Sequence, residues 1–135
     1  METEKYLGSW ELVPELCIYQ QGDPPLEGTY HIGSKNGAIE FRIAWKDQAG
    51  QEHNLEFGGP LDGEAHKSDA PGVSHVKYEK ISESILDSTS YDNGSILMYA
   101  RRIASADASL LSVMQRIMIG ESAHSNFQVY RRLNP

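Results

Sequence analysis

The sequence repeats one kind of tight turn at nearly even steps. Asn36-Gly37, Ala49-Gly50 and Asp62-Gly63 follow one another about thirteen residues apart, and Asn93-Gly94 continues the series. Asn-Gly or Asp-Gly between alternating apolar residues is the strongest local signal for a β-hairpin. A regular series of hairpins predicts one antiparallel sheet, which hides its edges best by closing on itself. We therefore expect an all-β fold, a single closed up-and-down antiparallel barrel of about 8–10 strands.

The stretches between the turns carry strand patterns. In residues 38–45, Ile39, Phe41, Ile43 and Trp45 alternate with smaller or polar residues, which places one apolar face on a strand. Further strands are expected over residues 8–13, 28–32, 51–57, 76–78, 84–91, 95–103, 109–118 and 127–133. The polar residues 64–72 predict a long mobile loop at one end of the barrel.

Size and composition point to one domain over residues 1–135, long enough to bury a core without disulfides. A formal net charge of −7 argues against a nucleic acid or an anionic membrane as partner. The single cysteine, Cys17, fits a reducing compartment, and the polar start does not resemble a secretion signal. The expected location is therefore the cytoplasm.

The later strands differ from the earlier ones because neither of their faces is purely apolar. Two arginine pairs, Arg101-Arg102 and Arg131-Arg132, lie inside strand patterns. Alternation turns one member of each pair inward, and a dry core would not accept it. A cavity that holds a ligand and water accepts such groups, so the pattern favours a cavity. The alternative is that the arginines point to solvent.

Motifs at both ends of the chain resemble a known family. Gly8-Ser9-Trp10 resembles the Gly-x-Trp motif of the calycin superfamily, which contains the lipocalins and the fatty-acid-binding proteins. With Val129-Tyr130-Arg131-Arg132 at the other end, the whole chain is similar to bacterial lipocalin-like barrels without a secretion signal. The resemblance implies that Trp10 closes one end of the barrel and that Arg131 or Arg132 packs across it as a structural plug, a favourable cation–π contact.

The sequence also departs from these families. The segment 14–26 is too short, and too rich in proline, for the two-helix lid of fatty-acid-binding proteins. Their Arg-x-Tyr carboxylate motif is replaced by Gln128-x-Tyr130-x-Arg132, which favours a polar cavity end over a fatty-acid site. Haem-binding barrels of the nitrobindin type carry an iron ligand near the position of His124, but their glycine-rich repeat after Gly-x-Trp is missing here.

Other site chemistry has little support in the sequence. The histidines lack metal-ligand spacing, although His66 and His75 flank the long loop with Asp69 between them. Cys17 lies between Leu16 and Ile18, where a thiol behaves as a small buried hydrophobe. We therefore expect no metal and no cofactor.

We interpret the sequence as that of a cytoplasmic lipocalin-like barrel that binds a small apolar or amphipathic ligand in its interior. The expected ligand contacts are an apolar wall and a set of polar groups: Tyr30, Phe41, Trp45 and Phe57 for the wall, and Tyr99, Arg101, Arg116 and Tyr130 for the polar contacts. Two alternatives remain open. One is a barrel enzyme of the isomerase, cyclase or hydratase type; the other is a structural or interaction module that forms a homodimer.

Overall fold

The computed structural model describes residues 4–20 and 22–133. In chain order the elements are β1 (Gly8–Leu12), the 3-10 turn η1 (Pro14–Leu16), β2 (Ile18–Tyr19), β3 (Glu27–Lys35), β4 (Ala38–Lys46), β5 (Glu52–Pro60), β6 (Ala65–Lys67), β7 (His75–Lys80), β8 (Ile85–Asp92), β9 (Ser95–Ala104), β10 (Leu110–Ile119) and β11 (Ser122–Arg132). None of the helices in these residues is long and apolar enough to cross a membrane.

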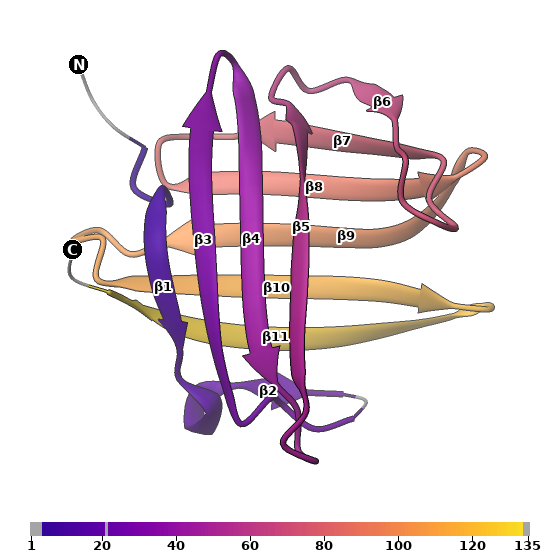
Figure 1. The fold of residues 1–135 in the computed structure, drawn as a ribbon. Helices are drawn as coiled ribbons and strands as arrows, with labels where there is room; N and C mark the ends of the chain where they lie inside the picture. The colour runs from indigo at the N-terminus through magenta and orange to yellow at the C-terminus, as the bar shows by residue number, and fades with distance from the viewer. Residues whose placement is uncertain (1–3, 21, 134–135) are drawn as a thin grey trace.

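The strands form one antiparallel sheet that curls into a nearly closed barrel. Its hydrogen-bonded order is β5-β4-β3-β1-β11-β10-β9-β8-β7-β6, and the short β2 pairs with β11 outside this order. Figure 1 shows two layers, in which β3, β4 and β5 run across the strands from β7 to β11. The expected all-β antiparallel barrel is therefore confirmed, with ten strands in continuous order.

The hairpin turns have the backbone that their sequences predict. Asn36 and Gly37 have φ angles of 52° and 80°, and Asn93 and Gly94 have φ angles of 48° and 94°. Two successive positive φ angles define the tight turn that matches the twist of a hairpin, and Asn-Gly adopts it at little cost. These turns join β3 to β4 and β8 to β9.

One part of the expected long loop is a strand. Residues 65–67 form β6, in which Ala65 pairs with Lys77 and Lys67 pairs with His75 on β7. Three residues are too few to display an alternating pattern, so the sequence did not reveal this strand. The loop that remains joins β6 to β7 at residues 68–74.

Trp10 fills one end of the barrel and is fully buried. Its Nε1 donates a hydrogen bond to the Tyr6 carbonyl at 3.0 Å, and the Arg132 guanidinium lies 4.1 Å from its ring centroid. Arg132 also donates to the carbonyls of Lys5, Leu7 and Ala108. One arginine therefore ties the chain start, the Trp10 ring and the turn before β10 together.

The neighbouring Arg131 has a different role. It points outward and pairs with Glu11 on β1, with Nε 2.7 Å from Oε1. Gly8 explains the first part of the Gly-x-Trp motif, since its φ is +124° and a Cβ there would clash with Nη1 of Arg132. Of the two arginines expected at the plug, the structure places Arg132 over Trp10 and Arg131 on the outer face.

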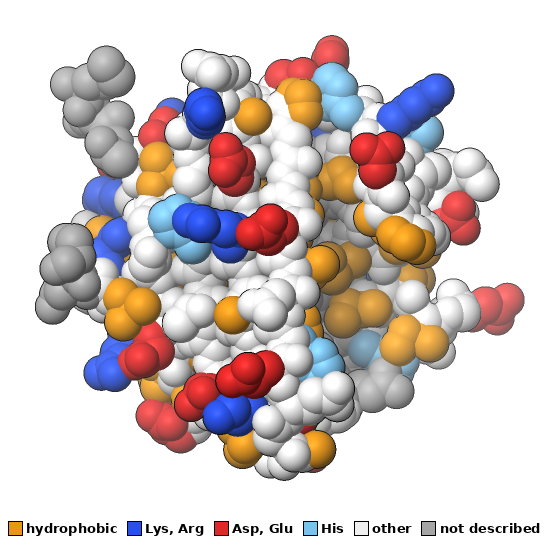
Figure 2. Space-filling model, in the orientation of Figure 1, with side chains coloured by type: hydrophobic (Ala, Val, Ile, Leu, Met, Phe, Trp, Pro, Cys, Tyr) orange, Lys and Arg blue, Asp and Glu red, His pale blue; other side chains and the backbone are white. Residues whose placement is uncertain are grey.

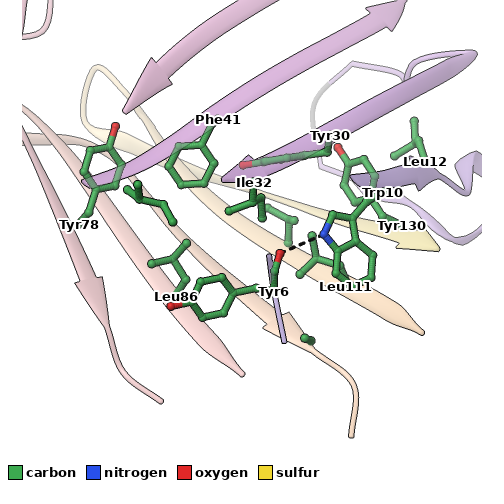
Figure 3. Close-up of a cluster of buried hydrophobic side chains, with 13 residues drawn as sticks. Tyr6, Trp10, Leu12, Tyr30, Ile32, Phe41, Tyr78, Leu86, Leu111 and Tyr130 are labelled. Atoms are coloured by element: carbon green, nitrogen blue, oxygen red, sulfur yellow. Dashed lines mark hydrogen bonds between the residues drawn. The ribbon is translucent and has the colours of Figure 1, made fainter. Parts of the chain in front are cut away.

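The hydrophobic core continues from Trp10 into the middle of the barrel (Figure 3). Its largest fully buried side chains are Trp10, Tyr6, Phe41, Ile32, Ile39, Leu86, Leu111 and Val113. These residues come from both layers and from the segment before β1. The interior next to Trp10 is therefore filled with side chains.

Candidate functional site

A pocket of about 330 Å³ adjoins the packed core, and Leu12, Tyr30 and Tyr130 belong to the core cluster and also line the pocket. It is found where β1 and β4 end and β5 begins, and residues of β10 and β11 close it from the opposite layer. Its volume falls at the lower end of the range for small-molecule sites, about 300–1,000 Å³. Figure 2 shows the molecule hollowed beside β5, with hydrophobic side chains on the wall of the hollow.

The walls of the pocket are mainly aromatic and aliphatic. Tyr30 and Tyr130 meet edge to face, with ring centroids 5.3 Å apart and planes at 86°. Trp45 stacks on His53 at 5.2 Å, and the two residues pair across β4 and β5. The aliphatic lining residues are Leu12, Pro25, Ile43, Ala44 and Leu55. Such walls suit a flat or branched apolar body.

A short chain of hydrogen bonds runs along the inner wall. The Tyr130 hydroxyl donates to Oε1 of Gln128 at 2.9 Å, and Nε2 of Gln128 donates to the Tyr19 hydroxyl. Burial raises the pKa of Tyr19 and raises that of Tyr130 well above its ordinary value. Both phenols are therefore neutral at neutral pH, and this wall carries no charge.

Gln115 adds a free amide to the same pocket. Its position on β10 faces Ala100 on β9 and Asn126 on β11, and its side chain lines the pocket. The Gln115 side chain makes no hydrogen bond to any residue that the structure describes. Its donors and its acceptor are free for a bound molecule.

Arg102 is the buried cation of the interior, with 2% of its surface exposed. Its Nε donates to the Tyr30 hydroxyl at 2.7 Å, and its Nη1 donates to Oγ of Ser88 at 2.9 Å. The guanidinium also lies 4.4 Å from the Phe41 ring centroid. Within the described residues, no carboxylate comes within 4.0 Å of it. Arg102 does not line the pocket, whereas Tyr30 lines the pocket and also contacts Arg102.

The rim of the pocket carries two carboxylates, Asp23 and Asp47. Oδ1 of Asp47 accepts hydrogen bonds from the backbone amides of Ala49 and Gln51, both at 2.9 Å, and Oδ2 lies 2.8 Å from Nε2 of His53. The hydrogen bond with His53, followed by that of the Gln51 amide, lowers the pKa of Asp47. The rim is therefore acidic at neutral pH.

The structure brings some of the expected ligand contacts together and separates others. Tyr30, Trp45 and Tyr130 line the pocket. Phe41 and Phe57 stack on each other at 4.8 Å, deeper in the barrel, and belong to or pack against the core. Phe41 packs edge to face against Tyr30, so its ring contacts the pocket lining from the core side.

The other three expected contacts lie on the outer face. Arg101 holds Asp87 through two hydrogen bonds of 2.8 Å, and the Tyr99 hydroxyl donates to the same carboxylate at 2.8 Å. Arg116 is exposed on β10. The physical reason is the two-residue period: Arg102 and Gln115 turn inward, so their neighbours in sequence turn outward. These positions correct our choice of arginine.

Four interior residues were not among the expected ligand contacts: Tyr19, Arg102, Gln115 and Gln128. Of these, Gln128 was expected only as part of a polar cavity end, and Arg102 only as one of a pair with a single inward member. Gln115 follows Leu111 and Val113 at the strand period, so the pattern on β10 could have found it. Tyr19 gives no such signal because β2 has two residues.

The histidines that flank the loop do not form a joint site. His66 pairs with Val76 and His75 pairs with Lys67, so their side chains leave opposite faces of the β6–β7 ladder. Instead, ligand atoms of Asp62, Glu64 and His66 lie within 4.8 Å of one another on the surface. His66 already pairs with Asp62 at 2.8 Å.

Comparison with known proteins defines the fold. No family model matches the sequence, and no curated protein matches it. Among solved structures, a mutant of the fluorescent protein UnaG matches with a TM-score of 0.65 and 17% identity over 98% of this chain and 99% of that chain. As-p18, an extracellular fatty acid binding protein, matches with a TM-score of 0.56 and 10% identity over 97% of this chain and 98% of that chain. The barrel therefore has the fold of these proteins.

Proposed function

We propose that this protein binds a small apolar or amphipathic molecule in the pocket beside Tyr30. The observation that carries the proposal is that side chains do not fill the whole interior: beside the packed core, a pocket of about 330 Å³ remains between the two layers. A barrel evolved for stability alone would fill this space as well, because empty apolar space costs free energy. The similarity in fold to a fatty acid binding protein is consistent with this proposal.

The lining favours binding over catalysis. Asp47 lies at the rim with His53 beside it, and Asp47 is occupied with the turn between β4 and β5. The deeper polar groups are amides and phenols with raised pKa values, which are poor proton acceptors at neutral pH. We also propose a cytoplasmic location, which the lone thiol of Cys17 supports.

Native mass spectrometry of the protein purified from its own host tests the proposal. We expect a co-purifying small molecule in the wild type and its loss in Leu55→Trp, because Leu55 lines the pocket and a larger ring there would fill it. The matched control is Leu26→Trp, since Leu26 is similarly exposed but does not line this pocket. Equal retention of the molecule in both variants would place its binding elsewhere.

A second candidate function is self-association through the outer face of the sheet. Ile18, Phe127 and Met114 are direct neighbours across β2, β11 and β10, and they are 70%, 37% and 45% exposed. Exposed apolar groups in contact with one another are typical of interaction surfaces. Static light scattering over a range of concentrations tests this candidate, and a monomer at every concentration would exclude it.

A further inference from the structure

We infer that the pocket is selective for molecules whose polar group is uncharged, such as a ketone or an amide, over molecules that carry a carboxylate. The inference rests on the proposed function and specifies the ligand class of the same pocket. It follows from three features of the lining: the neutral inner polar groups, the acidic rim, and the isolation of the buried arginine.

The inner polar groups offer hydrogen bonds without charge. The Tyr19 hydroxyl accepts from Gln128, so its own proton is free to be donated to a ligand oxygen. The Gln115 amide can donate to the same kind of oxygen, and it makes no side-chain hydrogen bond within the described part of the chain. A carbonyl oxygen is the acceptor that two such neutral donors satisfy.

The charged groups of the lining have the wrong sign for a carboxylate. Asp23 and Asp47 are the charged members of the lining, and the pKa of Asp47 is lowered by His53 and by the Gln51 amide. A carboxylate that enters the pocket approaches these like charges and also loses its hydration. Among the described residues, the lining contains no lysine or arginine to offset either cost.

Arg102 does not supply the missing positive charge, because its guanidinium already has hydrogen-bond partners in the protein. Tyr30 and Ser88 accept its hydrogen bonds, and the Phe41 ring lies against its guanidinium. Tyr30 lines the pocket and holds Arg102 through its hydroxyl, so a carboxylate in the pocket meets the Tyr30 side chain before the cation. To reach Arg102, the ligand would have to displace a buried ring.

Three naphthalene probes with the same apolar body test the inference: 2-acetonaphthone, 2-naphthoate and 2-ethylnaphthalene. Their dissociation constants are measured by isothermal titration calorimetry at neutral pH. We expect the ketone to bind at least tenfold more tightly than the carboxylate, and more tightly than the hydrocarbon by the several-fold factor that one or two hydrogen bonds provide.

Variants identify the groups responsible. Gln115→Leu is expected to remove most of the preference for the ketone over 2-ethylnaphthalene. The control variant, Asn54→Leu, changes an exposed side chain on β5 outside the pocket lining and is expected to retain the preference. A preference that survives unchanged in Gln115→Leu would overturn the role of this amide.

The outcomes separate the inference from the proposed function. If 2-naphthoate binds as tightly as the ketone or more tightly, the pocket binds ligands but the selectivity inferred here is wrong. If none of the three probes binds to the wild type, the proposed function fails together with the inference.

Discussion

Arg102 on β9 and Tyr30 on β3 join the two layers of the barrel through a hydrogen bond of 2.7 Å. The two residues are 72 positions apart in the sequence, and both are almost fully buried. Their contact lies between the packed core and the pocket. It therefore couples the stability of the interior to the shape of the candidate binding site.

Tyr30→Phe is expected to lower the free energy of unfolding by roughly 1.5–3 kcal/mol, because it removes an acceptor from a buried charged donor. Chemical denaturation measures the change. Tyr78→Phe is the control, since Tyr78 is equally buried but its hydroxyl neither donates nor accepts a hydrogen bond with another described residue. In a double-mutant cycle with Arg102→Met, additive losses would mean that the two side chains do not interact.

Asp87→Asn is expected to lower the free energy of unfolding at pH 7 by roughly 1.5–3 kcal/mol. Burial raises the pKa of Asp87, but the hydrogen bonds from Arg101 and Tyr99 lower it by more than burial raises it. The pKa of Asp87 in the folded protein is therefore below its ordinary value. A lowered pKa in the folded state stabilises the protein above the unfolded value of about 3.9 and ceases to do so as the pH falls through the folded value.

The difference between wild type and Asp87→Asn should therefore shrink below about pH 4. Denaturation curves at several pH values measure it. The exposed Asp92 on the same strand provides the control, and Asp92→Asn should change little at any pH. A pH of about 2.5 lies more than one unit below the unfolded pKa of an aspartate. A difference for Asp87→Asn that stays constant down to this pH would contradict the lowered pKa of Asp87 in the folded state.

The strands and their turns could be predicted because their signals are local. Asn36-Gly37 fixes a hairpin by its own backbone preference, and four apolar residues alternate along β4 from Ile39 to Trp45. Strand β6 escaped prediction because three residues contain no period. Its pairing with β7 is set by the rest of the sheet.

The polar part of the site depends on orientation, which a mixed strand does not reveal. On β9, Arg101 and Arg102 are chemically identical, and apolar residues stand on both faces of the strand. The choice is made by tertiary partners: Asp87 holds Arg101 outside, while Tyr30 and Ser88 hold Arg102 inside. Neither partner is adjacent in sequence, so the inward member of the pair required the structure.

Gly8→Ala is expected to destabilise the protein more than Gly50→Ala does. Both glycines have positive φ angles, of +124° and +82°, so each substitution carries a backbone cost of about 1 kcal/mol. At Gly8 a Cβ would also meet Nη1 of Arg132, whereas at Gly50 it would meet no atom within 4 Å. Thermal unfolding compares the stability of the two variants. Equal losses of stability would show that the Arg132 side chain can move away from a Cβ at position 8 without loss of stability.

Leu55→Trp is expected to weaken the binding of 2-acetonaphthone at least tenfold with little change in stability. Leu55 pairs with Ile43 across β5 and β4, lines the pocket, and is 49% exposed, so a larger side chain can enter the pocket without disturbing the core. Partly exposed positions usually change stability by about 0.5 kcal/mol or less. Leu26→Trp, at a position that is 47% exposed and outside this pocket, should leave the affinity unchanged. Calorimetric titration of both variants decides the matter, because equal weakening in both would show that the probe binds outside the pocket.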